Sequence, residues 1–287
     1  MSNIDPSQFK QGQRESWDSV AGGWQKWWKT TEAAGGKVSR RLIELAEIKE
    51  GSKVLDVATG IGEPSITAAH QVGKSGHILA IDISPEMLSI AEKRAISVGI
   101  QDVIEFREGD TETIDLSMST FDAALCRFGL MFLPDLGAGL SNIYKSLKEG
   151  GRFAAAVLGS SDKVPFISLA LNIVLKETNR PPPPANTPGP FSLSHENFLK
   201  DSFIKSGFED VTIEKLDMIF DFESAEAFTN FVFETVAPIQ AVLSNQSQER
   251  RNEILKVITN KVANRHADKN LGSVKLSNEA ICIAGRK

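Results

Sequence analysis

The chain has 287 residues, of which 41% are hydrophobic and 24% are charged. This is the composition of an ordinary globular protein, and it excludes disorder over the whole chain. The formal net charge of −5 repels phosphate backbones, so we expect no nucleic-acid partner.

Cysteine and histidine usage indicates neither disulfides nor a metal site. Cys126 and Cys282 each lie within an apolar run, and neither belongs to a CxxC motif, which predicts buried thiols in a reducing compartment. The four histidines lack the spacing of metal ligands, so we expect no metal. The N-terminus has no signal-peptide pattern and no apolar run is long enough to cross a bilayer. We therefore expect a cytoplasmic protein without a transmembrane segment.

The N-terminal region contains all four tryptophans of the chain. Large apolar side chains in residues 10–30 are spaced as one face of a helix: Trp17, Val20, Trp24, Trp27 and Trp28. Such a helix could anchor itself on the core, cover a ligand as a lid, or do both. We expect residues 1–39 to form an aromatic lid helix in front of one domain, residues 40–287.

Strands and helices alternate from residue 38 to residue 158. The predicted strands are residues 53–58, 77–82, 103–110, 121–128 and 152–158, and the predicted helices are residues 38–48, 64–72, 85–99 and 136–147. The strands are apolar runs typical of a parallel sheet buried on both faces. The fold class is therefore α/β, with a doubly wound sheet.

The regular alternation pauses after Leu158. Residues 180–190 contain six prolines, so we interpret them as an extended connection or a lid loop. The remaining elements are a helix over residues 193–208 capped at Ser194, a strand over 210–220, helices near 224–236 and 248–265, and a closing strand over 278–287. We expect helical cap or lid insertions near residues 160–192 and 221–275.

A glycine loop follows the first strand. In an open parallel sheet, ligands bind at the carboxyl ends of the strands. The loop Asp56-Val-Ala-Thr-Gly-Ile-Gly62 stands at such an end, and its glycines allow close approach of a ligand to the backbone. This pattern fits NAD, FAD or S-adenosylmethionine (SAM). The third glycine of the dinucleotide fingerprint is absent, because Ser65 stands in its place.

Acidic residues close the second and third strands. Asp82 could accept hydrogen bonds from a ribose diol, or it could belong to the N-terminal cap of the next helix. The carboxylate of Asp110, in Gly109-Asp110-Thr111, could accept the exocyclic amine of adenine, or it could form a turn. Together with the glycine loop, these residues favour an adenosine-containing cofactor.

Six segments resemble the motifs of class I SAM-dependent methyltransferases. VLDVATGIGEPS, AIDISPEML and EGDTE resemble their first three motifs, and FDAALCRFGLMFLPD, SLKEGGRF and SGFEDV resemble those at strands four, five and six. The most similar subgroup is methyltransferase type 11, which includes the ubiquinone/menaquinone biosynthesis C-methyltransferases. The resemblance covers roughly residues 40–220 and the last ten. Ala58 replaces the usual first glycine, Glu149 the usual proline, and Arg127-Phe128-Gly129 the Arg-Asn-Val of the quinone enzymes.

The resemblance implies a Rossmann-like sheet of order 3-2-1-4-5-7-6 with the last strand antiparallel, a SAM cofactor (product S-adenosylhomocysteine) and no metal. The implied cofactor-binding residues are Asp56, Ala58, Thr59, Gly60, Gly62, Asp82, Ile83, Met87, Gly109, Asp110, Thr111, Cys126 and Arg127. The implied substrate or lid residues are Trp17, Trp24, Phe128, Met131 and Phe191.

The implied reaction is methyl transfer to carbon or oxygen of a small aromatic or lipophilic acceptor. The protein then needs mainly to align the acceptor with the sulfonium and to exclude water. His195 is a candidate base, although it could equally be an exposed residue in the first turn of a helix, and Arg127 is a second candidate. A nicotinamide-dependent oxidoreductase and a non-catalytic SAM-binding protein remain alternatives, and so do a monomer and a homodimer.

Overall fold

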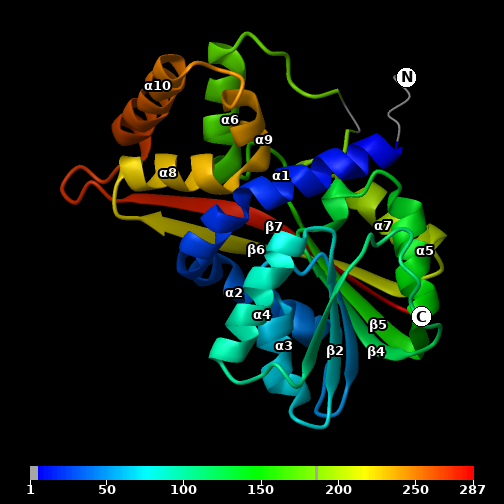
Figure 1. The fold of residues 1–287 in the computed structure, drawn as a ribbon. Coiled ribbons are helices and arrows are strands. Elements are labelled where there is room, and N and C mark those ends of the chain that lie inside the picture. Colours follow the sequence, from blue (N-terminus) through cyan, green and yellow to red (C-terminus); the bar gives the residue numbers. More distant parts are fainter. Residues whose placement is uncertain (1–5, 185–186) are drawn as a thin grey trace.

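The computed structural model describes residues 6–184 and 187–287 (Figure 1). It contains one seven-stranded sheet. The strands are β1 (Lys53–Val57), β2 (His77–Asp82), β3 (Ile104–Glu108), β4 (Phe121–Arg127), β5 (Leu147–Leu158), β6 (Glu209–Phe222) and β7 (Val274–Arg286).

The strand order is β3-β2-β1-β4-β5-β7-β6. Strands β1 to β5 pair in parallel, whereas β7 is antiparallel to both of its neighbours, β5 and β6. The predicted order and the predicted antiparallel last strand are thus confirmed. The central strands form because their apolar side chains are covered on both faces; Leu55, Ile78 and Leu125 are fully buried.

The helices cover the sheet and extend beyond it. They are α1 (Pro6–Lys26), α2 (Trp28–Leu45), α3 (Ser65–Val72), α4 (Pro85–Ser97), the 3₁₀ helix η1 (Leu130–Phe132), α5 (Leu136–Ser146), α6 (Pro165–Glu177), α7 (Glu196–Lys205), α8 (Ala225–Thr235), α9 (Ala237–Leu243) and α10 (Gln248–His266). Figure 1 shows α2, α3 and α4 on one side of the sheet and α5 and α7 on the other. Helices therefore cover both faces, as the doubly wound prediction requires.

A helical cap lies above the carboxyl ends of the central strands. It consists of α6, α8, α9 and α10, and β6 and β7 reach up to it (Figure 1). Among the strands, only β6 pairs with the first half of β7, because β5 pairs with residues 280–286 of β7. The two long strands thus form a ribbon that holds the cap over the sheet.

The N-terminal region differs from the expected single helix. The helix is interrupted at Trp27, which separates α1 from α2. Helix α2 then continues past residue 39, the expected end of the N-terminal unit. The prediction that all four tryptophans share one face is wrong for Trp28. Its ring lies under the guanidinium of Arg94 at 5.0 Å, whereas Trp17 and Trp24 pack with Val20 on a separate cluster.

Several element boundaries also differ. The structure places His195 at the N-cap of α7, one residue later than the expected Ser194, and α7 ends at Lys205. Strand β7 begins at Val274, four residues before the expected start. The individual helices α6 and α9 were not predicted.

None of the helices that the structure describes combines the length and the apolar character needed to cross a membrane.

Candidate functional site

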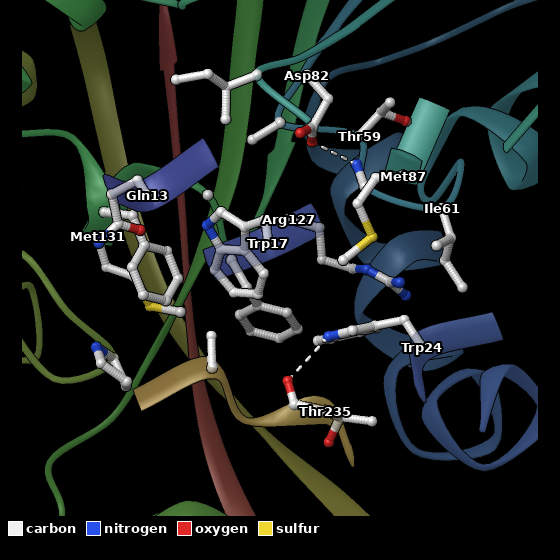
Figure 2. Close-up of a pocket in the computed structure, with 18 of the residues that line it drawn as sticks. Gln13, Trp17, Trp24, Thr59, Ile61, Asp82, Met87, Arg127, Met131 and Thr235 are labelled. Carbon is white, nitrogen blue, oxygen red and sulfur yellow. Dashed lines mark hydrogen bonds between the residues drawn. The ribbon is translucent and has the colours of Figure 1, made fainter. Parts of the chain in front are cut away.

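A cavity of about 220 Å³ opens at the carboxyl ends of β1, β2 and β4. Its walls come from the loops after these strands, from α1 and from the cap. Figure 2 shows Thr59 and Asp82 on one side of this cavity, the tryptophans of α1 across it, and Thr235 of the cap below. The cavity therefore has a polar half at the strand ends and an apolar half under the cap.

The glycine loop has an unusual backbone conformation. Ala58, Gly60 and Gly62 have φ angles of 56°, 57° and 99°, the region that glycine occupies at least cost. A side chain at Gly129 would lie 2.4 Å from the Cβ of Ala58, so Gly129 must be glycine if the loop keeps this path. The loop thus brings its backbone close to the cavity at Ala58 and Gly60.

Asp56 holds the loop from behind. One of its carboxylate oxygens accepts the hydroxyls of Thr59 at 2.7 Å and Ser65 at 2.6 Å, together with the amide of Ser65 at 3.1 Å. Burial raises the pKa of Asp56 to about 7, and these hydrogen bonds oppose the rise. Ser65, which replaces the third glycine of the dinucleotide fingerprint, is therefore part of the support of the loop. Asp56 itself does not line the cavity.

Asp82 lies at the cavity wall with its carboxylate fixed by the backbone. Its two oxygens accept the amides of Gly60 at 2.8 Å and Ser84 at 2.9 Å. Burial raises the pKa of Asp82 to about 6, although both amides favour the charged form. Each oxygen keeps a lone pair for a further donor. A buried carboxylate held in this way can accept hydroxyl groups of a ligand.

Asp110 also lines the cavity, but it already has a cationic partner. The ammonium of Lys10, from α1, lies 2.6 Å from Asp110 and 2.6 Å from Glu112. Despite the opposing effect of desolvation, the hydrogen bonds from Lys10, Glu112 and Thr113 lower the pKa of Asp110. Sequence reasoning missed Lys10, because nothing local relates it to a residue 100 positions away.

Arg127 is the buried cation of the site. It forms an ion pair with Glu32 of α2 at 2.8 Å and donates to the hydroxyl of Ser39 at 2.9 Å. Glu63 lines the cavity beside it, and its pKa is raised by burial and by the charge of Glu32. Glu32 and Glu63 were not among the expected site residues.

Helix α1 forms one wall of the cavity through Gln13, Trp17 and Trp24. The ring of Trp17 packs edge to face on Phe132 at 5.0 Å, and the indole of Trp24 donates to the carbonyl of Thr235 at 3.0 Å. The helix is therefore connected both to the strand ends and to the cap.

The apolar half of the cavity is lined by Leu158, Phe166, Ile167, Met218, Phe220, Phe231, Val236, Ala237 and Pro238. Three of these are aromatic and contact one another. Phe166 stacks on Phe220 at 4.5 Å, and Phe220 lies 5.5 Å from Phe231. This half can accommodate a flat apolar group.

The structure brings most of the predicted site residues to one cavity. The predicted residues on its wall are Trp17, Trp24, Ala58, Thr59, Gly60, Asp82, Ile83, Met87, Gly109, Asp110, Thr111, Arg127, Phe128 and Met131. Asp56, Gly62 and Cys126 lie behind this wall, and Pro190 reaches the cavity in place of Phe191. Cys126 is fully buried, and desolvation raises the pKa of its thiol to about 12.

His195 does not reach the cavity. It is exposed at the N-cap of α7, and its side chain makes no capping hydrogen bond. The expectation that His195 acts as a base therefore has no geometric support. The alternative, an exposed residue at the start of a helix, agrees with the structure. Within residues 6–184 and 187–287, no group of three or more His, Cys, Asp or Glu side chains could hold a metal ion.

Comparison with known proteins identifies relatives of the central region. Residues 36–177 match the model of the ubiE/COQ5 methyltransferase family. The ubiquinone/menaquinone biosynthesis C-methyltransferase UbiE of Pseudomonas fluorescens is 31% identical over 135 residues, which are 47% of this chain and 49% of that protein. UbiE of Cellvibrio japonicus is 34% identical over 135 residues, 47% of this chain and 50% of that protein. The chain thus spans about half the length of these curated relatives.

Solved structures share the fold over most of the chain. A putative methyltransferase from Bacillus halodurans has a TM-score of 0.55 at 20% identity, covering 87% of this chain and 98% of that one. Phosphoethanolamine N-methyltransferase 2 of Haemonchus contortus, solved with SAM, has a TM-score of 0.54 at 18% identity, covering 88% of this chain and 52% of that one. The resemblance expected from the motifs is therefore confirmed: residues 36–177 match the ubiE/COQ5 methyltransferase family, and the sheet has the Rossmann-like fold of methyltransferases.

Proposed function

We propose that the protein is a SAM-dependent methyltransferase that acts on a small aromatic or lipophilic acceptor. The observation that carries this proposal is the continuity of one cavity, whose polar half lies at the glycine loop and Asp82 and whose other half is apolar. A polar cofactor and an apolar acceptor would then meet between the loop and the cap. The family match of residues 36–177 supports the same reaction class.

The residues of the polar half fit the cofactor. A ribose diol would donate to the carboxylate of Asp82, and Ile83 and Met87 offer apolar contact to an adenine ring. The methionine end would lie along the glycine loop, where Ala58 and Gly60 line the cavity and small residues allow a ligand to approach the backbone closely. When bound, the cofactor supplies an electrophilic methyl group on a sulfonium. Asp110 would contact the adenine edge, which requires that Lys10 share or yield this carboxylate.

The aromatic wall supports an aromatic acceptor. Phe166, Phe220 and Phe231 offer ring faces and edges to a flat ligand, and Met131 lines the same cavity. The chain's part in catalysis would be to align the acceptor and to exclude water. Helix α1 would act as the lid over both halves, within an N-terminal unit of residues 1–39. The two free buried cysteines support work in a reducing compartment such as the cytoplasm.

Methyl transfer from labelled SAM to phenols, hydroquinones and indoles tests the proposal. We expect turnover with at least one of these acceptors. Phe166→Leu should raise the KM for the acceptor several-fold, because it removes one ring face, and should leave SAM affinity unchanged. The exposed Phe198 offers a matched control, since Phe198→Leu lies outside the cavity. SAM binding without turnover on any acceptor would favour the non-catalytic SAM-binding alternative.

A further inference from the structure

We propose that Arg127 binds the α-carboxylate at the amino-acid end of the cofactor, and that it thereby distinguishes SAM and S-adenosylhomocysteine from shorter adenosyl thioethers. The inference rests on the proposed function and assigns a specific task to one residue of that site. Arg127 lines the cavity, and its guanidinium points toward Ile61 and Trp24 (Figure 2).

The guanidinium has an unused pair of donors. Its five N–H groups make three hydrogen bonds with described residues: two from Nη1, to Glu32 at 3.3 Å and to Ser39 at 2.9 Å, and one from Nη2, to Glu32 at 2.8 Å. The N–H of Nε and the second N–H of Nη2 have no partner in that part of the chain. These two groups lie on the same side of the guanidinium and form a fork that matches a carboxylate.

The position of Arg127 is fixed before a ligand arrives. Glu32 and Ser39 of α2 hold the head group, and Gly35 of the same helix makes room for it. A side chain at Gly35 would place its Cβ 3.1 Å from Nη1 of Arg127. Because the side chain of Arg127 is only 8% exposed, its remaining donors have little access to water. A ligand carboxylate could bind them without displacing Glu32.

The charges around Arg127 suit a zwitterion. Glu32, Glu63 and Asp56 all act on the charge of Arg127, and Arg94 lies 3.5 Å from Glu63, so the two cations already face three carboxyl groups. A lone anion would add to this excess of acidic groups, whereas an amino-acid group adds no net charge. Glu63, which lines the cavity beside Thr31 and Gly35, can face the ammonium group while Arg127 binds the carboxylate.

Calorimetric titration with two ligands tests the assignment: S-adenosylhomocysteine, which has the amino-acid end, and 5′-methylthioadenosine, which lacks it. The double variant E32Q/R127M removes both members of the ion pair, so that neither is left buried without the other. We expect it to lose about tenfold or more in affinity for S-adenosylhomocysteine and to keep its affinity for methylthioadenosine. R127K keeps the charge without the fork and should show a smaller loss of the same selectivity.

R41M/E214Q is the matched control, because it removes another paired arginine and glutamate that join α2 to the sheet away from the cavity. It should bind both ligands as the wild type does. Equal losses for both ligands in E32Q/R127M and in R127K would overturn the assignment, since Arg127 would then act through packing of α2. Unchanged affinity for both would also overturn it. Absence of any S-adenosylhomocysteine binding to the wild-type protein would instead defeat the proposed function, and this assignment with it.

Discussion

Asp56 and Asp82 are buried carboxylates at neighbouring strand ends, and their partners give them different tasks. Asp56 accepts three hydrogen bonds from Thr59 and Ser65, and it does not line the cavity. Asp82 uses two backbone amides to fix its carboxylate at the cavity wall. Burial raises both pKa values, so the ionisation state of each carboxylate changes near neutral pH.

Affinity for S-adenosylhomocysteine should depend on the ionisation of Asp82. The pKa of about 6 refers to the protein without ligand, and only the carboxylate accepts both ribose hydroxyls. Affinity should therefore be full above pH 7 and should fall about tenfold between pH 7 and pH 5, as the carboxylate takes up a proton. Calorimetric titration across this range measures the loss.

Asp82→Asn provides the control for this pH dependence. It should bind weakly at pH 7 and should show no further loss attributable to this group at pH 5. A wild-type affinity that is constant from pH 7 to pH 5 would contradict the placement of the ribose on Asp82. The sign for stability is opposite, because a raised pKa means that ionised Asp82 destabilises the unliganded fold. This cost is complete above about pH 6 and decreases as the pH falls from there toward the ordinary value of 3.8.

Helix α1 is the element that joins the two halves of the site. Lys10 connects its start to Asp110 and Glu112, and Trp24 connects its end to Thr235 of the cap. Because α1 forms a wall of the cavity, a ligand that enters from this side requires it to move. The ion pairs of Lys10 are half-buried and stabilise the closed position.

Lys10→Met should open this lid more often. If α1 gates the cavity, the association and dissociation rates of S-adenosylhomocysteine should both rise several-fold, while the dissociation constant changes by less than about threefold. Stopped-flow fluorescence of the tryptophans measures both rates. Lys148→Met is a suitable control, because it removes a 2.6 Å ion pair with Asp122 outside this cavity. Unchanged rates in Lys10→Met would contradict the lid.

The elements were predictable where their pattern is local. The strands β1, β2 and β4 are short apolar runs followed by loops, and Ser84 and Pro85 mark the start of α4, where the Ser84 hydroxyl accepts the amide of Met87. Helix α6 was missed although Pro165 stands at its start and its buried residues Ile167, Ala170, Ile173 and Val174 recur at helical spacing. Helix α9 was missed because it has only seven residues and contains Pro238.

The site was predictable at the strand ends and at Trp17 and Trp24 of α1, whose spacing marks one face of a helix. Asp82 and Asp110 follow strands, so their place at one edge of the sheet could be inferred from topology. The pairing of Arg127 with Glu32 spans 95 residues, and no local pattern reports it. The position of His195 before a helix does not determine whether its side chain faces the cavity or solvent. In the structure this residue is exposed.

At the scale of the molecule, the cavity lies where three parts meet: the parallel sheet, the N-terminal helix and the cap carried by β6 and β7 (Figure 1). The ends of the strands and the loops after them supply most of the polar residues, and the apolar residues come from all three parts. The family match ends at residue 177, so α8 and α9, which help to wall the apolar half of the cavity, lie outside it. The choice of acceptor should therefore be set largely by the part of the chain that is least like the curated relatives.

Thermal unfolding with S-adenosylhomocysteine, NADH or buffer alone tests the central claim most directly. A ligand at about a hundred times its dissociation constant stabilises the folded state by roughly 2.7 kcal/mol. For a chain of 287 residues, this corresponds to a rise of about 4–5 °C in Tm. The account predicts this rise with S-adenosylhomocysteine and none with NADH. A rise with NADH and none with S-adenosylhomocysteine would contradict it.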